Sequence, residues 1–148
     1  MFWVAVVNGF RCGFPAGVLA GLVSALLSIA NREAGRMVTT PTGVVENTPA
    51  LIFVGALLWG AITGVILGIA YVLLMERLKP GLNPLFVALL YTWTIAFLVL
   101  CFAHGRISIP GQSFFYTQAK TILLYTLLGA GLGVGYTHLP KRGEQFDN

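Results

Sequence analysis

An uncharged stretch from Pro49 to Met75 constrains this chain more than any other feature of its sequence. As a helix rising about 1.5 Å per residue it would reach roughly 40 Å, which exceeds the ~30 Å hydrocarbon core of a bilayer. It therefore predicts a membrane-spanning helix that tilts or extends into the interface. Gly60, Gly64 and Gly68 recur at every fourth residue within it and share one helix face. Because such a face lets a neighbouring helix approach closely, we predict helix packing there.

The composition of the whole chain favours the same membrane environment. Hydrophobic residues make up 57% of the 148 residues and charged residues only 9%, whereas soluble domains average about 25% charged residues. We therefore predict a single membrane domain over residues 1–148, an all-α integral membrane protein with four transmembrane helices in an up-and-down bundle. The expected spans cover residues 13–30, 50–75, 85–103 and 120–139.

The first eleven residues are expected to form a separate, short N-terminal interfacial helix. Its apolar residues follow helical spacing and are Phe2, Trp3, Val6, Val7 and Phe10. Pro15 favours a break before the first span, because proline is tolerated in the first turn of a helix and is costly further inside. One long, tilted first span is the alternative.

Two other spans carry glycines at the same spacing. The first span contains Gly13, Gly17 and Gly21, which make it the expected partner of the Gly60, Gly64 and Gly68 face. The fourth span contains two overlapping ladders with a four-residue spacing, one of which includes Gly129 and Gly133. On the second span, Leu67 is expected on the side opposite Gly60 and Gly64.

Two tryptophans lie near the middle of their spans, away from the interface where aromatic residues are usually enriched. Trp59 stands beside Gly60, and Trp93 stands between two threonines. We expect these rings to pack over glycine notches. Stacking against a pigment, a quinone or a lipid tail is the alternative, so the cofactors to consider are a lipid, a chlorophyll-type pigment or a quinone at the helix surface.

The two histidines and two cysteines are placed at span ends. His104 closes the third span and His138 the fourth, so these side chains are expected at opposite membrane faces, roughly 30 Å apart, where they cannot share one haem or metal ion. Either histidine could be an axial pigment ligand, but we expect structural roles for both, and no metal site. Cys12 and Cys101 fall on opposite faces in the same way, which excludes a disulfide between them.

The acidic residues bear on whether the chain transports protons or solutes. All five fall in loops, helix ends or the tail, and they are Glu33, Glu46, Glu76, Glu144 and Asp147. Proton-coupled carriers use an ionisable group inside a span, and small multidrug transporters place a glutamate in the first span, where this chain has none. No nucleophile with a base, phosphate-binding loop or zinc-ligand spacing is visible, so we do not expect an enzyme.

These patterns together favour a non-catalytic integral membrane subunit that packs into a larger membrane complex, with a respiratory or photosynthetic electron-transport assembly as the expected setting. Its partners would be other membrane protein subunits and lipids rather than nucleic acid, because the basic residues sit at helix ends. A small oligomeric transporter or channel is the alternative. Five of the nine basic residues fall on the side of the termini, so we expect a multi-pass protein of the bacterial inner membrane with cytoplasmic termini.

Overall fold

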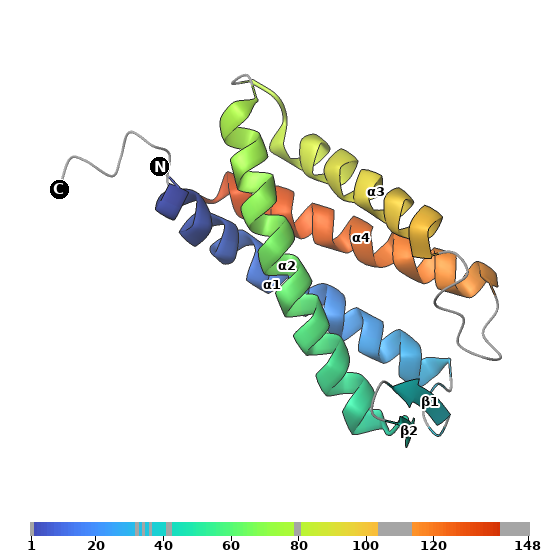
Figure 1. The fold of residues 1–148 in the computed structure, drawn as a ribbon. Coiled ribbons are helices and arrows are strands. Elements are labelled where there is room, and N and C mark those ends of the chain that lie inside the picture. The colour runs from blue at the N-terminus through green and yellow to red at the C-terminus, as the bar shows by residue number, and fades with distance from the viewer. Residues whose placement is uncertain are drawn as a thin grey trace.

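Four long helices dominate the structure of the chain, a computed structural model that describes residues 2–31, 33, 35, 37–40, 43–78, 81–103 and 114–139 (Figure 1). The elements are α1 (Phe2–Ala30), β1 (Met37–Thr40), β2 (Gly43–Glu46), α2 (Pro49–Arg77), α3 (Pro84–Ala103) and α4 (Phe114–Thr137). All four helices are long and apolar enough to cross a membrane. The predicted all-α, four-helix membrane architecture is therefore confirmed.

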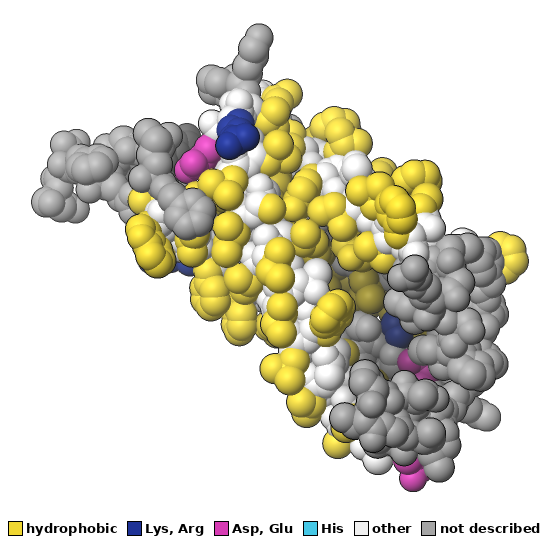
Figure 2. Space-filling view, in the orientation of Figure 1, with side chains coloured by type: hydrophobic (Ala, Val, Ile, Leu, Met, Phe, Trp, Pro, Cys, Tyr) yellow, Lys and Arg dark blue, Asp and Glu magenta, His cyan; other side chains and the backbone are white. Residues whose placement is uncertain are grey.

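The surface of the bundle has the character that this architecture requires. Figure 2 shows hydrophobic side chains spread over the visible face of the helices, with charged side chains near the two ends. The start of α1 and the end of α4 lie at the same end of the bundle (Figure 1), as an even number of spans demands. The chain is thus built as a multi-pass membrane protein.

α1 is one continuous helix, so the prediction of a separate interfacial helix before a break at Pro15 is wrong. Residues 2–11 form its first turns, and Pro15 lies in its interior. The physical reason is packing: a Cβ atom added to Gly9 would lie 2.6 Å from the backbone nitrogen of Ile69, so α2 supports α1 on the N-terminal side of the proline as well. Neighbouring helices commonly compensate for proline in membrane helices.

The helices form two antiparallel hairpins joined through α1 and α4. α1 packs along α2, α3 packs along α4, and α1 also packs along α4. α2 has few contacts with either α3 or α4, although α3 follows it directly in the chain. In Figure 1 α2 crosses over α1 and α4, and its N-terminal half extends away from α3. The bundle is therefore open between α2 and the pair of helices formed by α3 and α4.

The α1–α2 interface is a contact between glycine backbones. A Cβ atom added to Gly17 would lie 2.8 Å from the Cα of Gly64, and one added to Gly60 would lie 2.8 Å from the Cα of Gly21. At Gly68 the added atom would lie 2.7 Å from the Cα of Gly13. Real side chains do not approach this closely, so neither helix has room for one along this face.

α4 uses its glycines on two opposite faces. Gly129 and Gly133 lie against α3, where a Cβ atom added to Gly133 would lie 2.6 Å from the Cα of Leu85. Gly131 and Gly135 lie against α1, and Cβ atoms added there would lie 3.2 Å from the Cα atoms of Ala16 and Cys12. Because residues two apart point to roughly opposite sides of a helix, this alternation lets α4 sit closely between two partners.

Two tyrosines tie α2 to α3 near the turn that connects them. The Tyr71 hydroxyl donates to the Pro84 carbonyl at 2.6 Å, and the Tyr91 hydroxyl donates to the Leu67 carbonyl at 3.4 Å. Leu67 itself is partly buried against the core, so its expected place opposite Gly60 is wrong. Seven residues are nearly two full helical turns, which brings Leu67 back close to the side of Gly60.

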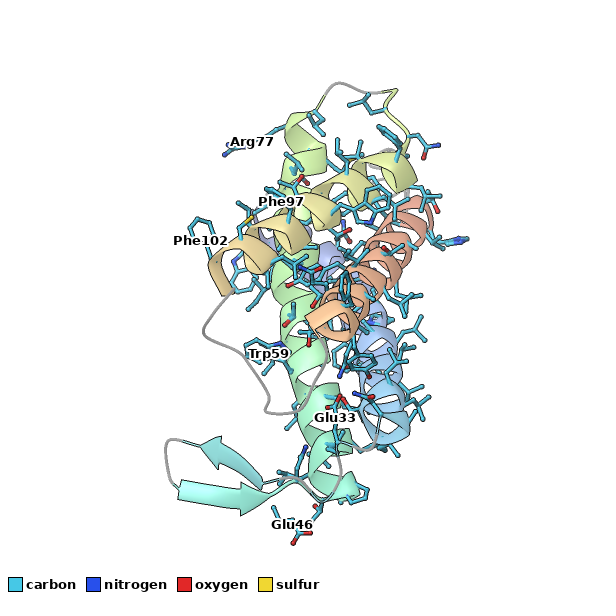
Figure 3. All side chains as sticks on the ribbon, turned by 90° about the vertical axis from the view of Figure 1, so that its right-hand side faces the viewer. Glu33, Glu46, Trp59, Arg77, Phe97 and Phe102 are labelled. Carbon is cyan, nitrogen blue, oxygen red and sulfur yellow. The ribbon has the colours of Figure 1, made fainter. Side chains whose placement is uncertain are left out.

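The connection between α1 and α2 contains a short β-hairpin. β1 and β2 pair antiparallel in the register Met37↔Glu46 to Thr40↔Gly43. In Figure 3 this hairpin projects sideways from the start of α2. The sequence does not predict this hairpin, because strands of four residues are too short to show a periodicity of their own.

The backbone contact between α1 and α2 predicts that Gly64→Leu abolishes the folded form of the purified chain in detergent. Overpacking costs about 1–3 kcal/mol or more, and helix contacts in lipid are each worth no more than roughly that. Gly17→Leu should act in the same way. Gly55→Leu is the matched control on α2, because nothing lies within 4 Å of a Cβ atom added there. Helix content and thermal unfolding by circular dichroism measure the effect, and a Gly64→Leu chain that melts like the wild type contradicts this packing.

Candidate functional site

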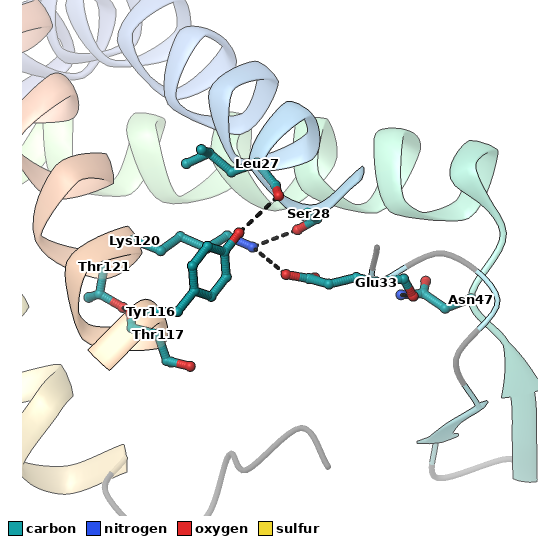
Figure 4. Close-up of polar contacts among 8 residues, drawn as sticks. All are labelled: Leu27, Ser28, Glu33, Asn47, Tyr116, Thr117, Lys120 and Thr121. Carbon is teal, nitrogen blue, oxygen red and sulfur yellow. Dashed lines mark hydrogen bonds and ion pairs between the residues drawn. The ribbon is translucent and has the colours of Figure 1, made fainter. Parts of the chain in front are cut away.

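A charged pair is buried where the end of α1 meets the start of α4. Lys120 Nζ lies 3.4 Å from Glu33 Oε1, and the two side chains are only 17% and 7% exposed, respectively. Lys120 is the seventh residue of α4, about 9 Å along the helix from Phe114. Figure 4 shows the two side chains pointing toward each other. This is the one ion pair between described residues, and its low exposure makes either charge costly without its partner.

Hydrogen bonds hold both partners of this pair. Lys120 Nζ also donates to Ser28 Oγ at 2.5 Å. The backbone nitrogen of Glu33 donates to the Ser28 carbonyl at 3.0 Å, and Asn47 Nδ2 donates to the Glu33 carbonyl at 3.3 Å. The backbone of Glu33 is therefore attached to the end of α1 on one side and to Asn47, just before α2, on the other, which fixes its position.

Tyr116 adds a further contact between the same two helices. Its hydroxyl donates to the Leu27 carbonyl at 2.9 Å, and this carbonyl also accepts from the backbone nitrogen of Asn31 at 2.9 Å. Lys120 Nζ lies 5.8 Å from the centre of the Tyr116 ring, at the outer limit of a cation–π contact. The cluster of Ser28, Glu33, Tyr116 and Lys120 thus closes one end of the α1–α4 interface (Figure 4).

The sequence pattern places Glu33 in a loop and Lys120 at the start of a span, and it does not predict that they pair. One signal could have found the pair. On this side of the membrane the chain has two carboxylates, Glu33 and Glu46, and Lys120 needs a partner if it enters the bilayer. Glu46 is exposed in the structure and points away from the helices in Figure 3, which leaves Glu33 as the partner.

The other predicted site residues are distributed over the bundle rather than gathered. Gly13, Gly17 and Gly21 lie against Gly60, Gly64 and Gly68, and Gly129 and Gly133 lie against α3. His138 is exposed just after α4, and His104 lies outside the described residues. Cys12 is buried and Cys101 is exposed. Among the described residues, no three His, Cys, Asp or Glu side chains are grouped so that they could hold a metal ion.

The two mid-span tryptophans do not pack over glycine notches as expected. Trp59 is 73% exposed and projects from the side of α2 in Figure 3, while the neighbouring Gly60 faces α1. Trp93 is also exposed, and its Nε1 donates to the Thr126 hydroxyl on α4 at 3.0 Å. Both rings are therefore available to molecules in the surrounding membrane.

Comparison with protein-family models, with curated proteins and with solved structures finds no match to this chain.

The buried pair predicts a characteristic pattern of stability changes. Glu33→Gln and Lys120→Met should each destabilise the chain by roughly 3 kcal/mol, the low end of the range for breaking a buried pair, because each leaves an unpaired charge. The double variant should lose less than the sum of the two, since neither charge then remains. Thermal unfolding of the four proteins in detergent gives the double-mutant cycle. Simple additivity of the two losses would show that the pair contributes no coupling.

The histidines are predicted to be structural. His104→Gln and His138→Gln should leave the visible absorbance of the protein purified from its own membrane unchanged, because glutamine removes an axial nitrogen ligand and keeps hydrogen-bonding capacity. Loss of a Soret or chlorophyll band in either variant would make that histidine a pigment ligand.

Proposed function

We propose that this chain is a non-catalytic membrane subunit whose α2 helix packs against a helix of an unlike chain. The observation that carries the proposal is the exposure of α2 on the sides that do not face α1. Its most apolar 18-residue window is only 11% buried, against 44% for the corresponding window of α1. α2 and α3 are equally the most apolar spans of the chain, and α2 has the smaller buried share of the two.

Gly55 marks the face of α2 on which a partner would sit. Unlike Gly60, Gly64 and Gly68, it has nothing within 4 Å of the position of a Cβ atom. Glycine destabilises a helix by about 1 kcal/mol relative to alanine, and within this chain no close contact offsets that cost. The side chains around it on the outer face are large, exposed aliphatics: Leu51, Leu58, Ile62 and Ile66. A notch between bulky side chains suits close helix–helix packing in lipid.

The membrane complex that we propose for this subunit is a respiratory or photosynthetic electron-transport assembly. The second candidate function is a small oligomeric transporter or channel, which is favoured by the same Gly55 face if a second copy of this chain occupies it. The two candidate functions predict complexes made of different chains. A subunit is found with unlike chains at fixed stoichiometry, whereas a transporter forms a homo-oligomer and moves solute in liposomes.

Native mass spectrometry of the protein extracted from its own membrane in mild detergent tests this proposal. We expect complexes with unlike chains for the wild type and their loss for Gly55→Leu, which fills the notch. Val54→Phe enlarges an exposed side chain next to Gly55 and serves as the lipid-facing control, with complexes retained. Equal recovery of complexes with Gly55→Leu would place the contact elsewhere, and detection of homo-oligomers alone would favour the transporter.

A further inference from the structure

A groove runs between α1, α2 and α4 on the open side of the bundle. Its volume is about 90 Å³, and it is open along one side. Trp59, Leu124 and Leu128 form apolar walls, and three hydroxyl-bearing residues line it: Ser24 from α1, Thr63 from α2 and Tyr125 from α4. The remaining lining is small residues, so the floor is close to the helix backbones. The groove is thus mainly apolar, with one hydroxyl-bearing residue from each of its three helices.

These three hydroxyls differ from the others in the helices. Five threonines donate to a carbonyl of their own helix, and they are Thr92, Thr94, Thr121, Thr126 and Thr137. Tyr71, Tyr91 and Tyr116 likewise donate to carbonyls. Among the described residues, Ser24, Thr63 and Tyr125 have no hydrogen-bond partner. An unsatisfied hydroxyl in hydrocarbon is unfavourable, so a ligand that accepts hydrogen bonds from these side chains would be stabilised in the groove.

The depth of these hydroxyls in the membrane restricts which class of ligand could reach them. Thr63 lies 14 residues after Pro49, roughly 21 Å along α2, and Tyr125 lies 11 residues after Phe114, about 16 Å along α4. These positions are inside the hydrocarbon core rather than at the interface. A phospholipid offers only its acyl tails at such depth, and these cannot form hydrogen bonds. The ligand must carry polar atoms into the membrane interior.

The spacing of the hydroxyls along the groove suits a ring with two polar ends. Gly17 packs on Gly64, so Thr63 lies close to the level of Gly17, whereas Ser24 lies seven residues further along α1. Seven residues correspond to roughly 10 Å. Tyr125 stands between Lys120, which contacts Ser28, and Gly131, which contacts Ala16, and is therefore near the level of Ser24. A six-membered ring with carbonyls on opposite edges and a hydrogen bond of about 2.8 Å at each end spans a similar length.

We infer that this groove binds the head group of a lipid-soluble quinone. The ring would lie between Trp59 and the leucines of α4, with one carbonyl accepting from Ser24 or Tyr125 and the other from Thr63. The groove volume of about 90 Å³ is smaller than the cavity of about 150 Å³ that accommodates benzene, so a single ring fits because the groove is open along one side, and a macrocyclic pigment is excluded. The inference goes beyond the proposed subunit role and does not depend on it, because the groove lies within one chain.

Quenching of Trp59 fluorescence by decylubiquinone in nanodiscs tests the inference. Trp3→Phe and Trp93→Phe leave Trp59 as the one tryptophan of the three. We expect saturable quenching, and we expect Thr63→Val and Tyr125→Phe each to raise the Kd about two- to tenfold, since each removes one hydrogen bond and little volume. Thr94→Val removes an exposed hydroxyl of α3 outside the groove and should leave the Kd unchanged. Circular dichroism shows whether each variant is folded.

Decylbenzene is the matched competitor, because it has the same tail and no carbonyl. We expect it not to displace the quinone at equal concentration. Quenching that rises linearly with the quinone-to-lipid ratio and is the same in every folded variant would overturn the inference, since it reports partitioning into lipid. Full recovery of Trp59 fluorescence on addition of decylbenzene at equal concentration would also overturn it, because the groove would then recognise apolar shape alone.

Discussion

The rest of the structure depends on the backbone contact between α1 and α2. Within a bilayer the hydrophobic effect does not drive helices together, so their association relies on close packing and on hydrogen bonds. Gly13, Gly17 and Gly21 provide that contact by removing side chains from the meeting face. α1 then carries α4 on another side, through Ala16 and Gly131 at mid-length and through the Lys120 cluster at one end. α3 is attached mainly through α4, and α1 is therefore the central helix of the bundle.

The sequence predicted those parts of the fold that depend on the residue pattern within a single segment. Long uncharged runs and a four-residue glycine spacing are properties of single segments, so the four helices and their small-residue faces can be identified before any contact is known. Continuity through Pro15 could not be predicted, because a contact at Gly9 outweighs the local preference for a break. The Glu33–Lys120 pair was missed for a related reason: its members lie 87 residues apart, and only the folded loop brings them together.

The open side of the bundle follows from how the close-packing faces are used. α4 has two glycine faces, and both are occupied, one by α1 and the other by α3. No such face is left on α4 for α2, which is held along its length by α1 and near its end by Tyr71 and Tyr91. The exposed Gly55 face and the groove beside Thr63 are consequences of this one arrangement. A closed four-helix bundle would bury both of them.

The proposed partner face and the proposed quinone groove are neighbours on α2. At about 100° per residue, Gly55 points roughly 140° away from Gly60, which faces α1, so a partner helix would sit on the far side of α2. Thr63 is only about 80° from Gly55 in the same projection, and Trp59 is about 40° from it. A helix seated on the Gly55 face would therefore contact Trp59, a wall of the groove, as well. A partner helix on the proposed Gly55 face would therefore also restrict the motion of the Trp59 ring, so the two proposals are linked through this one side chain.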